Sequence, residues 1–344
     1  MRTRVLSVAA LAAAALVATT TALAGGSAGK DSGVLTGAGA TFPFPLISQW
    51  QKDYESKTGV KINYNPIGSG GGIAAITGRT VDFGTSDAPL SPDQMSACKG
   101  CVQIPWVLSS TAVLYNLPGL PNNLKLTGTI VAGIYLGKIT HWNDAAIKKV
   151  NPGINLPDTK VTPVWRSDGS GTTYNFTDYL ASVSAEFKSK VGNSTQVSWP
   201  TGVGGRGSSG VAGVVKNTPG AVGYADIAYA LTNKIQFARV QNRDGKFVTP
   251  GLRAISAAAS LVKEVPTTNE MHIVNPPKGN PLAYPICTFS YVLLPTKTDK
   301  AAALRKFVFY ALTQGQKLGP RLLFVPVPKV VLVAAEKTLK RVQA

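Results

Sequence analysis

Hydrophobic residues recur along the chain in two alternating periods. Leu46, Ile47, Trp50 and Tyr54 fall at helical spacing, which predicts a helix with one buried face. The stretch before it, "VLTGAGATF", is typical of a strand and turn, and the stretch after it, "VKINYNPIG", alternates as a strand does. The chain therefore opens with a strand, a helix and a second strand.

This alternation continues to the C-terminus. "TFSYVLLP" predicts a strand, and "KAAALRKFVFYAL" and "KVVLVAAEKTLKRV" predict helices. A single amphipathic helix is expected after residue 173, with these residues on one face: Phe176, Tyr179, Leu180, Val183 and Phe187. Strands alternating with helices of this length predict an α/β fold with mostly parallel sheets. The sequence contains no internal repeat.

The first 24 residues are typical of an export signal. Arg2 and Arg4 precede a short apolar stretch, and Ala22-Leu23-Ala24 supplies a cleavage site. The alternative is a membrane anchor, but about 14 apolar residues are fewer than the roughly 20 needed to span a bilayer. No cysteine follows the apolar stretch, so we expect no lipid anchor, and no later stretch predicts a transmembrane helix.

Length and charge limit the classes of partner. At 344 residues the chain can form two domains, and its net charge of +18 favours anionic ligands, polymers or membrane surfaces. The basic residues are scattered, so we expect no nucleic-acid binding.

"GVGGRG" (202–207), with Asp226 downstream, matches a dinucleotide-binding pattern, but one match in so glycine-rich a chain is weak evidence for nucleotide binding.

The chain has three cysteines. Cys98 and Cys101 form "CKGC", which in an exported protein favours a local disulfide over half of a zinc site, since no second Cys/His pair follows. A redox motif should open a helix, whereas the "VQIPWVL" that follows predicts a strand. Cys287 is expected to be a buried thiol.

Three turns share one design, in which a strand leads through Gly, Ser or Thr into a helix. They are "GAGATFP", "GSGGG" and "RSDGSGTT". Each would present free backbone N–H groups and a hydroxyl at the positive end of a helix. One such turn is usually an N-cap, but three turns together with Arg166 predict an oxyanion site.

Enzymatic signatures are missing from the sequence. Neither serine-centred turn fits G-x-S-x-G, because Asp168 and Ile67 occupy the first glycine position. No Walker A loop is present. His141 and His272 lie near no motif and are expected to be surface or capping residues. We therefore predict no metal, no cofactor and no catalysis.

Taken in order, several stretches resemble the signatures of periplasmic phosphate-binding proteins, the substrate-binding component of the phosphate ABC transporter (PstS family). They are "TGAGATFPFPLISQW", "IGSGGGIAAI", "VDFGTSDAPLS", "IYLGKITHWND", "RSDGSGTTYNFTDYL", "WPTGVGGRGSSGVAGVV" and "PGAVGYADIAYA". The likeness runs from about Leu35 to the C-terminus and is weaker between about residues 240 and 285. The "CKGC" insert and the excess of Lys and Arg over Asp and Glu are not typical of that family.

The resemblance implies a type II periplasmic-binding-protein-like fold. Two α/β lobes would be joined by a two-strand hinge, with the ligand in the cleft between them. The implied boundaries are a lead-in over residues 25–33, lobe 1 from residues 34–113 and 287–344, and lobe 2 from residues 114–286. The chain would cross between lobes near residues 112–116 and 284–289.

The resemblance also implies the phosphate ligands. They are Thr41, Phe42, Ser69 and Asp87 from lobe 1, and Arg166, Asp168, Ser170, Gly171 and Thr172 from lobe 2. Arg166 would pair with phosphate while Asp168 orients its guanidinium; alternatively Asp168 only forms the turn. Asp87 would accept a hydrogen bond from the proton on phosphate and so reject sulfate; alternatively it is an exposed loop carboxylate.

The function implied is phosphate binding outside the cytoplasmic membrane, by a monomer that delivers its ligand to an ABC permease. The protein would be periplasmic, or secreted and associated with the envelope. Two other classes stay open from the residues alone. One is a phosphatase or phosphotransferase using the same anion site, and the other is an envelope protein that uses its basic surface.

Overall fold

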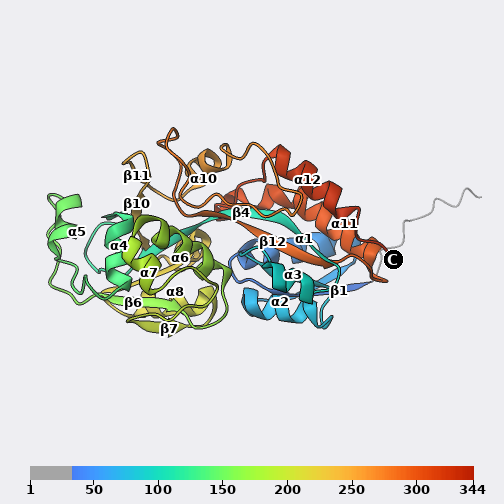
Figure 1. Cartoon of the computed structure of the whole chain (residues 1–344), viewed down its shortest axis with the longest axis horizontal. Coiled ribbons are helices and arrows are strands. Elements are labelled where there is room, and N and C mark those ends of the chain that lie inside the picture. Colours follow the sequence, from blue (N-terminus) through green and yellow to red (C-terminus); the bar gives the residue numbers. More distant parts are fainter. Residues whose placement is uncertain (1–32) are drawn as a thin grey trace, which may run out of the picture.

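The computed structural model describes residues 33–344, so the expected signal sequence and nearly all of the lead-in lie outside the described residues. The chain forms two α/β halves on one continuous sheet (Figure 1). The strand order is β2-β1-β3-β12-β4-β8-β6-β7, with β9 paired to β4. This arrangement confirms the predicted α/β class.

The first half begins as the hydrophobic pattern predicts. Its parallel strands are β1 (Val34–Gly39), β2 (Lys61–Asn65) and β3 (Phe83–Ser86). Its helices are α1 (Phe44–Thr58), α2 (Ser69–Thr77), α3 (Pro92–Ala97), α11 (Ala301–Leu312) and α12 (Lys329–Leu339), with short 3₁₀ turns η1 (Gln314–Leu318) and η2 (Pro320–Leu322). The four apolar residues at helical spacing in α1 are all buried.

The second half repeats this parallel arrangement. Its strands are β6 (Thr162–Arg166), β7 (Val203–Gly205) and β8 (Ala221–Asp226). Its helices are α4 (Gly128–Tyr135), α5 (Ala145–Val150), α6 (Gly171–Val183), α7 (Ala185–Lys190), α8 (Gly207–Asn217), α9 (Ile227–Asn233) and α10 (Leu252–Ala259). Short strands β5 (Lys125–Leu126), β9 (Gln236–Phe237), β10 (Arg239–Gln241) and β11 (Phe247–Val248) complete it.

Two long antiparallel strands join the halves. β4 (Cys101–Tyr115) pairs with β12 (Cys287–Pro295) over residues 101–110 and with β8 over residues 111–115. The Thr111 N–H donates to the Ile286 carbonyl at 2.8 Å where the partner changes. The expectation of mostly parallel sheets is therefore wrong in the middle of the sheet. Both strands are buried along their whole length, and a continuous apolar run does not reveal direction.

Each half has an aromatic core. In the first, the Trp50 and Trp106 ring centroids lie 5.0 Å apart, edge to face. In the second, Phe176 stacks on Tyr224 with centroids 4.2 Å apart. These ring contacts hold α1 and α6 against the sheet. The starts of α2 in the first half and α6 in the second half meet at the boundary between the two halves.

The single helix expected through Phe187 is two helices. α6 ends at Val183, and Ser184 takes an extended conformation with φ −142° and ψ 107°. The Ser184 hydroxyl accepts from the Phe187 N–H at 3.2 Å and so caps α7. Apolar spacing survives the break, since Phe187 is still buried, which is why the pattern alone missed it.

The cysteines lie as the sequence suggests. Cys98 and Cys101 are joined as a disulfide at the start of β4. Cys287 is a free, buried thiol, and burial raises its pKa well above the usual value. Among residues 33–344, no helix has the length and apolar character needed to cross a bilayer.

Candidate functional site

Arg166 is a buried cation at the end of β6, with 3% of its surface exposed. Its Nε and Nη2 atoms donate to the two carboxylate oxygens of Asp168 at 2.7 and 2.5 Å. Burial tends to raise the pKa of Asp168, but Arg166 offsets this and the net shift is downward. The pair fixes the guanidinium plane and leaves Nη1 3.5 Å from both the Thr172 and Ser208 hydroxyl oxygens.

The start of α6 supplies three predicted residues, of which Thr172 lies 3.5 Å from this nitrogen. Ser170 is the N-cap, and its hydroxyl accepts from the Thr173 N–H at 3.1 Å. That bond leaves the Ser170 O–H free to donate elsewhere. Gly171 and Thr172 open the helix, where backbone N–H groups and the helix dipole favour an anion.

A fourth helix start, that of α8, joins the site, and sequence reasoning assigned no site residue to it. The Ser208 N–H donates to the Thr41 hydroxyl at 3.0 Å, and the two hydroxyl oxygens lie 2.8 Å apart. The signal was present, since "GGRGSS" also places Gly and Ser between a strand and a helix. Phe42 is fully buried with its ring packed edge-on against Phe324, so only its backbone can serve a ligand.

The two halves touch directly around these helix starts. The Ser69 hydroxyl, at the start of α2, accepts from the Gly171 N–H at 3.0 Å and the Asp87 N–H at 3.3 Å. The Gly70 N–H donates to the Gly169 carbonyl at 2.9 Å. The described arrangement is therefore closed, with residues of both halves in hydrogen-bond contact.

Asp87 is a buried carboxylate at this contact, 1% exposed. One oxygen accepts from the Ser290 hydroxyl at 2.7 Å and the other from the Thr172 hydroxyl at 3.2 Å. Burial is the main cause that raises its pKa to about 6, while Arg166 and these two hydroxyls act in the opposite direction. The alternative of an exposed loop carboxylate does not hold.

Two further residues support Asp87 and were not predicted. Ser290 lies in β12, and the Asn175 amide of α6 donates to the Asp87 carbonyl at 2.7 Å and to the Gly171 carbonyl at 2.8 Å. Ser290 is 203 residues from Asp87 in sequence, and its motif indicated only a strand. Only the tertiary fold brings these groups together.

Hydrogen bonds thus link Arg166, directly or through one another, to six of the other predicted residues: Thr41, Ser69, Asp87, Asp168, Gly171 and Thr172. Phe42 and Ser170 are chain neighbours of Thr41 and Gly171, and the structure adds Ser208, Ser290 and Asn175. Hydroxyls, helix N-termini and one guanidinium converge, which suits a small oxyanion, and the carboxylate of Asp87 suits one that carries a proton. Over the described residues, no group of three or more His, Cys, Asp or Glu could hold a metal ion.

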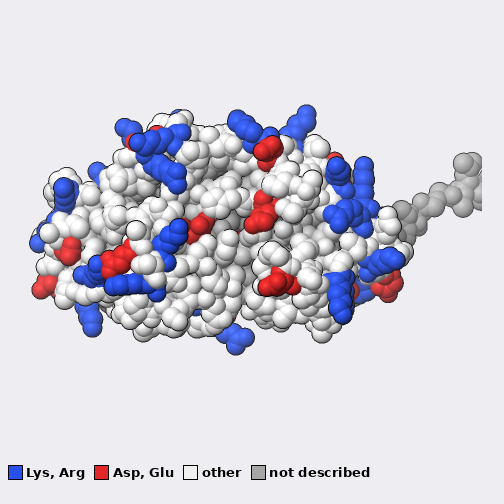
Figure 2. Space-filling view, viewed as in Figure 1, with Lys and Arg blue, Asp and Glu red and all other residues white. Residues whose placement is uncertain are grey.

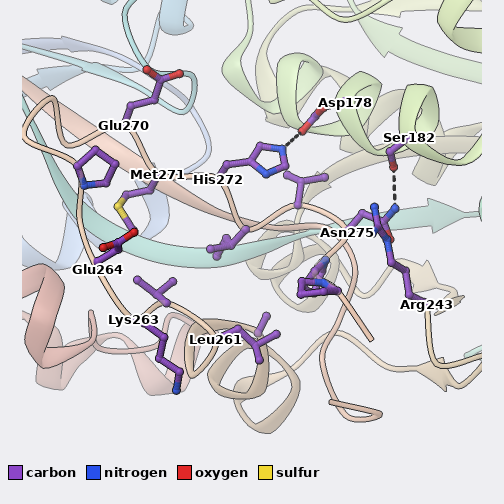
Figure 3. Close-up of a pocket in the computed structure, with 17 residues that line it drawn as sticks. Asp178, Ser182, Arg243, Leu261, Lys263, Glu264, Glu270, Met271, His272 and Asn275 are labelled. Atoms are coloured by element: carbon purple, nitrogen blue, oxygen red, sulfur yellow. Dashed lines mark hydrogen bonds and ion pairs between the residues drawn. The ribbon is translucent and has the colours of Figure 1, made fainter. Parts of the chain in front are cut away.

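Cavity size does not single out this site. A hollow of about 270 Å³ at its edge is lined by Thr41, Asp168, Gly207 and Tyr229, among others. A larger one, of about 620 Å³, lies elsewhere, between α6 and the segment from residues 261 to 277 (Figure 3). There His272 Nε2 lies 2.6 Å from a carboxylate oxygen of Asp178, and the hydrogen bond that this carboxylate accepts raises the pKa of His272. His272 is exposed, as predicted. The hydrogen-bond donors around Arg166 lie instead at the smaller hollow, which is lined by Thr41 and Asp168.

Residues 24–314 match the model of the PBP superfamily domain. The chain is 46% identical over 298 residues to the phosphate-binding protein PstS of Xylella fastidiosa strain Temecula1, covering 86% of this chain and 81% of the relative. It is 40% identical over 302 residues to PstS of Pasteurella multocida strain Pm70, covering 87% of each chain.

Solved structures show the same fold. A high affinity periplasmic phosphate-binding protein bound with phosphate has a TM-score of 0.72 and 22% identity, covering 88% of this chain and 93% of that one. A phosphate-binding protein from Stenotrophomonas maltophilia has a TM-score of 0.70 and 20% identity, with the same coverage.

Proposed function

Because the chain belongs to the PstS family of phosphate-binding proteins, within the PBP superfamily, we propose that it captures inorganic phosphate between its two halves and delivers it to an ABC-type permease. The observation that supports phosphate as the ligand is that Thr172 and Ser208, at two helix starts beside Arg166, stand next to hydrogen bonds that reach helix starts of the first half. The Ser208 hydroxyl lies 2.8 Å from the Thr41 hydroxyl, and the Gly171 N–H donates to Ser69. Like these relatives, which are phosphate-binding proteins, it is a binding protein and not an enzyme.

In this proposal the phosphate lies against Arg166 Nη1, between the hydroxyls of Thr172 and Ser208. Ser170, Thr41 and Ser69 add hydroxyl donors, and the Phe42 and Gly171 backbones line the same space. Asp168 acts through Arg166, because both of its oxygens already accept from that guanidinium. The Thr41 and Ser208 hydroxyls, now 2.8 Å apart, would turn towards the ligand.

Asp87 would select phosphate over sulfate. Phosphate carries a proton at neutral pH and can donate to the carboxylate, whose two oxygens have lone pairs to spare beyond the Ser290 and Thr172 bonds. Sulfate carries no proton, so it would oppose a buried carboxylate without a hydrogen bond. Sites that require a substrate hydrogen reject analogues lacking it by about 10⁴-fold or more.

Sulfate binding is expected to depend on pH through Asp87. Sulfate requires the protonated carboxyl, which is scarce above the raised pKa of about 6. Its affinity should therefore rise about ten-fold per unit as pH falls from about 8 to 6, and level off below that. Calorimetric titrations with sulfate across this range measure it. A flat profile would contradict the role of Asp87.

The same raised pKa affects the stability of the ligand-free protein. Because the folded pKa of about 6 exceeds the ordinary 3.8, protonation of Asp87 favours the folded state. This contribution is fully present below the ordinary value and is lost as pH rises through about 6.

Closure of the two halves depends on Gly171. A Cβ there would lie 2.4 Å from the Ala88 nitrogen and 2.6 Å from the Asp87 carbonyl carbon, both in the opposite half. Gly171→Ala is expected to weaken phosphate binding about 5- to 150-fold, the equivalent of about 1–3 kcal/mol of overpacking. Gly213→Ala in α8, where a Cβ meets nothing within 4 Å, is the control. Unchanged affinity in Gly171→Ala would contradict the closed binding state.

Export and delivery complete the proposal. The signal expected in residues 1–24 would direct a monomer across the cytoplasmic membrane, to the periplasm or the outer envelope. The affinity for phosphate would then serve capture at low concentration. Phosphate uptake by host cells lacking this chain should fall and should be restored by the wild-type chain. Unchanged phosphate uptake by the cells lacking this chain, at limiting phosphate, would contradict the transport role.

Calorimetric titration of residues 25–344, stripped of phosphate, tests the ligand. We expect one phosphate bound per chain at neutral pH, and sulfate bound more weakly by about 10⁴-fold or more. A folded sample that binds no phosphate would overturn the proposal, and equal binding of the two anions would overturn the selectivity alone.

A further inference from the structure

The positive charge of the first half is concentrated in the C-terminal part of the chain. Residues 34–113 carry five Lys or Arg and five Asp or Glu, whereas residues 287–344 carry ten Lys or Arg and two Asp or Glu. Figure 2 shows Lys and Arg side chains gathered at the end of the molecule where Figure 1 places α11 and α12. Charge is therefore not spread evenly over this half.

Helices α11 and α12 lie side by side and expose apolar side chains among these cations. Phe309 on α11 is 49% exposed and Val333 on α12 is 57% exposed. Between the helices is a groove of about 340 Å³, lined by Arg305, Lys306, Phe309, Glu336, Leu339 and Lys340. We call this surface the α11–α12 face. Lys300, which pairs with Asp82 at 2.9 Å, is not part of it.

We propose that the α11–α12 face docks on a bilayer surface of anionic phospholipid. Lys337, Lys340 and Arg305 would lie at the level of the headgroups, and Phe309 and Val333 would enter the boundary with the acyl chains. The apolar side chains favour a membrane over a soluble polyanion, because a polyanion pairs with cations but offers nothing apolar to Phe309 or Val333.

This orientation turns the edge of the proposed phosphate site away from the membrane. The hollow at the edge of the site is lined by Ile67, just before α2, and by Gly207 and Ser209 of α8, among others. Figure 1 draws these helices on the other side of β4 and β12 from α11 and α12. The described chain begins near the start of α11, because Nζ of Lys300, the N-cap of that helix, donates to the Val34 carbonyl at 3.2 Å. Docking would hold the protein at a membrane without blocking its ligand.

Co-sedimentation with vesicles tests the electrostatic part. Residues 25–344, saturated with phosphate so that its own anion site is occupied, are mixed with vesicles of phosphatidylglycerol and phosphatidylcholine or of phosphatidylcholine alone. We expect binding only to the anionic vesicles, lost at high salt. Lys337→Glu/Lys340→Glu should weaken it about ten-fold or more. Lys148→Glu/Lys149→Glu on α5 makes the same charge change in the other half and should have little effect.

A second variant tests the apolar part. Phe309→Ser/Val333→Ser keeps every charge and should weaken vesicle binding at least several-fold, and phosphate titration checks that each variant is folded. Three outcomes would overturn the proposal: no binding of the wild-type chain to anionic vesicles, equal losses in the α5 control, or no effect of the apolar variant. The last would identify a general polyanion surface instead.

Discussion

Asp87→Asn is expected to make the protein bind sulfate while it still binds phosphate. The amide keeps an oxygen to accept from the Ser290 hydroxyl, now at 2.7 Å, and places an N–H₂ where the second carboxylate oxygen meets Thr172. That group can donate to an unprotonated oxygen of either anion. The discrimination of about 10⁴-fold expected of the wild type should fall to within about ten-fold.

Competition titrations of phosphate against sulfate at neutral pH measure this change. Asp93→Asn, at an exposed position in α3, removes the same charge away from the site and should leave the ratio intact. The pH dependence of sulfate binding should also vanish in Asp87→Asn, because no carboxyl remains to titrate. A variant that binds phosphate normally and still ignores sulfate would show that another group discriminates.

Arg166→Met is expected to weaken phosphate binding about 30- to 5,000-fold. Truncating one member of a buried, hydrogen-bonded charge pair costs about 2–5 kcal/mol. Arg166 is 3% exposed and supplies the guanidinium on which the other donors converge. Its loss also removes the two bonds from the guanidinium to Asp168, which keeps only the Gly207 N–H bond, so the uncompensated negative charge would repel the ligand.

Two controls separate binding from folding. Arg206→Met, at the exposed N-cap of α8, removes a cation from the edge of the site and should cost far less. Arg166→Met/Asp168→Asn removes both members of the pair, which restores stability but not affinity. Thermal melts establish that each variant folds. Near-normal phosphate binding by the double variant would refute the role proposed for Arg166.

Much of the fold could be predicted from local periodicity. The strand–helix order from β1 to β3 follows from apolar spacing, and the turns that open α2 and α6 were found from glycine and hydroxyl residues. The antiparallel β4 and β12 could not be, because strands buried on both faces carry no alternation that reports direction. The break at Ser184 was missed because a serine that caps one helix can follow another without interrupting the apolar spacing.

The site divides in the same way. Residues within glycine-rich turns were identifiable because their chemistry is local, and the resemblance assigned their roles. Ser290 and Asn175 were not, because each acts on Asp87 from a distant part of the chain. Ser208 could have been predicted, because its turn also places Gly and Ser between a strand and a helix, as the three recognised turns do. Hydrogen-bond donors at helix starts can therefore be recognised in the sequence, whereas the residues that hold the buried carboxylate of Asp87 in place cannot.

The pairing of β4 with β12 has a mechanical consequence. The chain passes between the halves in two adjacent segments, within β4 and just before β12, and the Thr111 N–H donates to the Ile286 carbonyl at that point. Two adjacent crossings resist sliding and twisting, so the easiest motion left is bending about one axis across both. The Ser69, Gly70 and Asn175 bonds between the halves would then break together and not one by one. A receptor that levers one half away from the other could therefore empty the cleft in a single stroke, without touching the ligand.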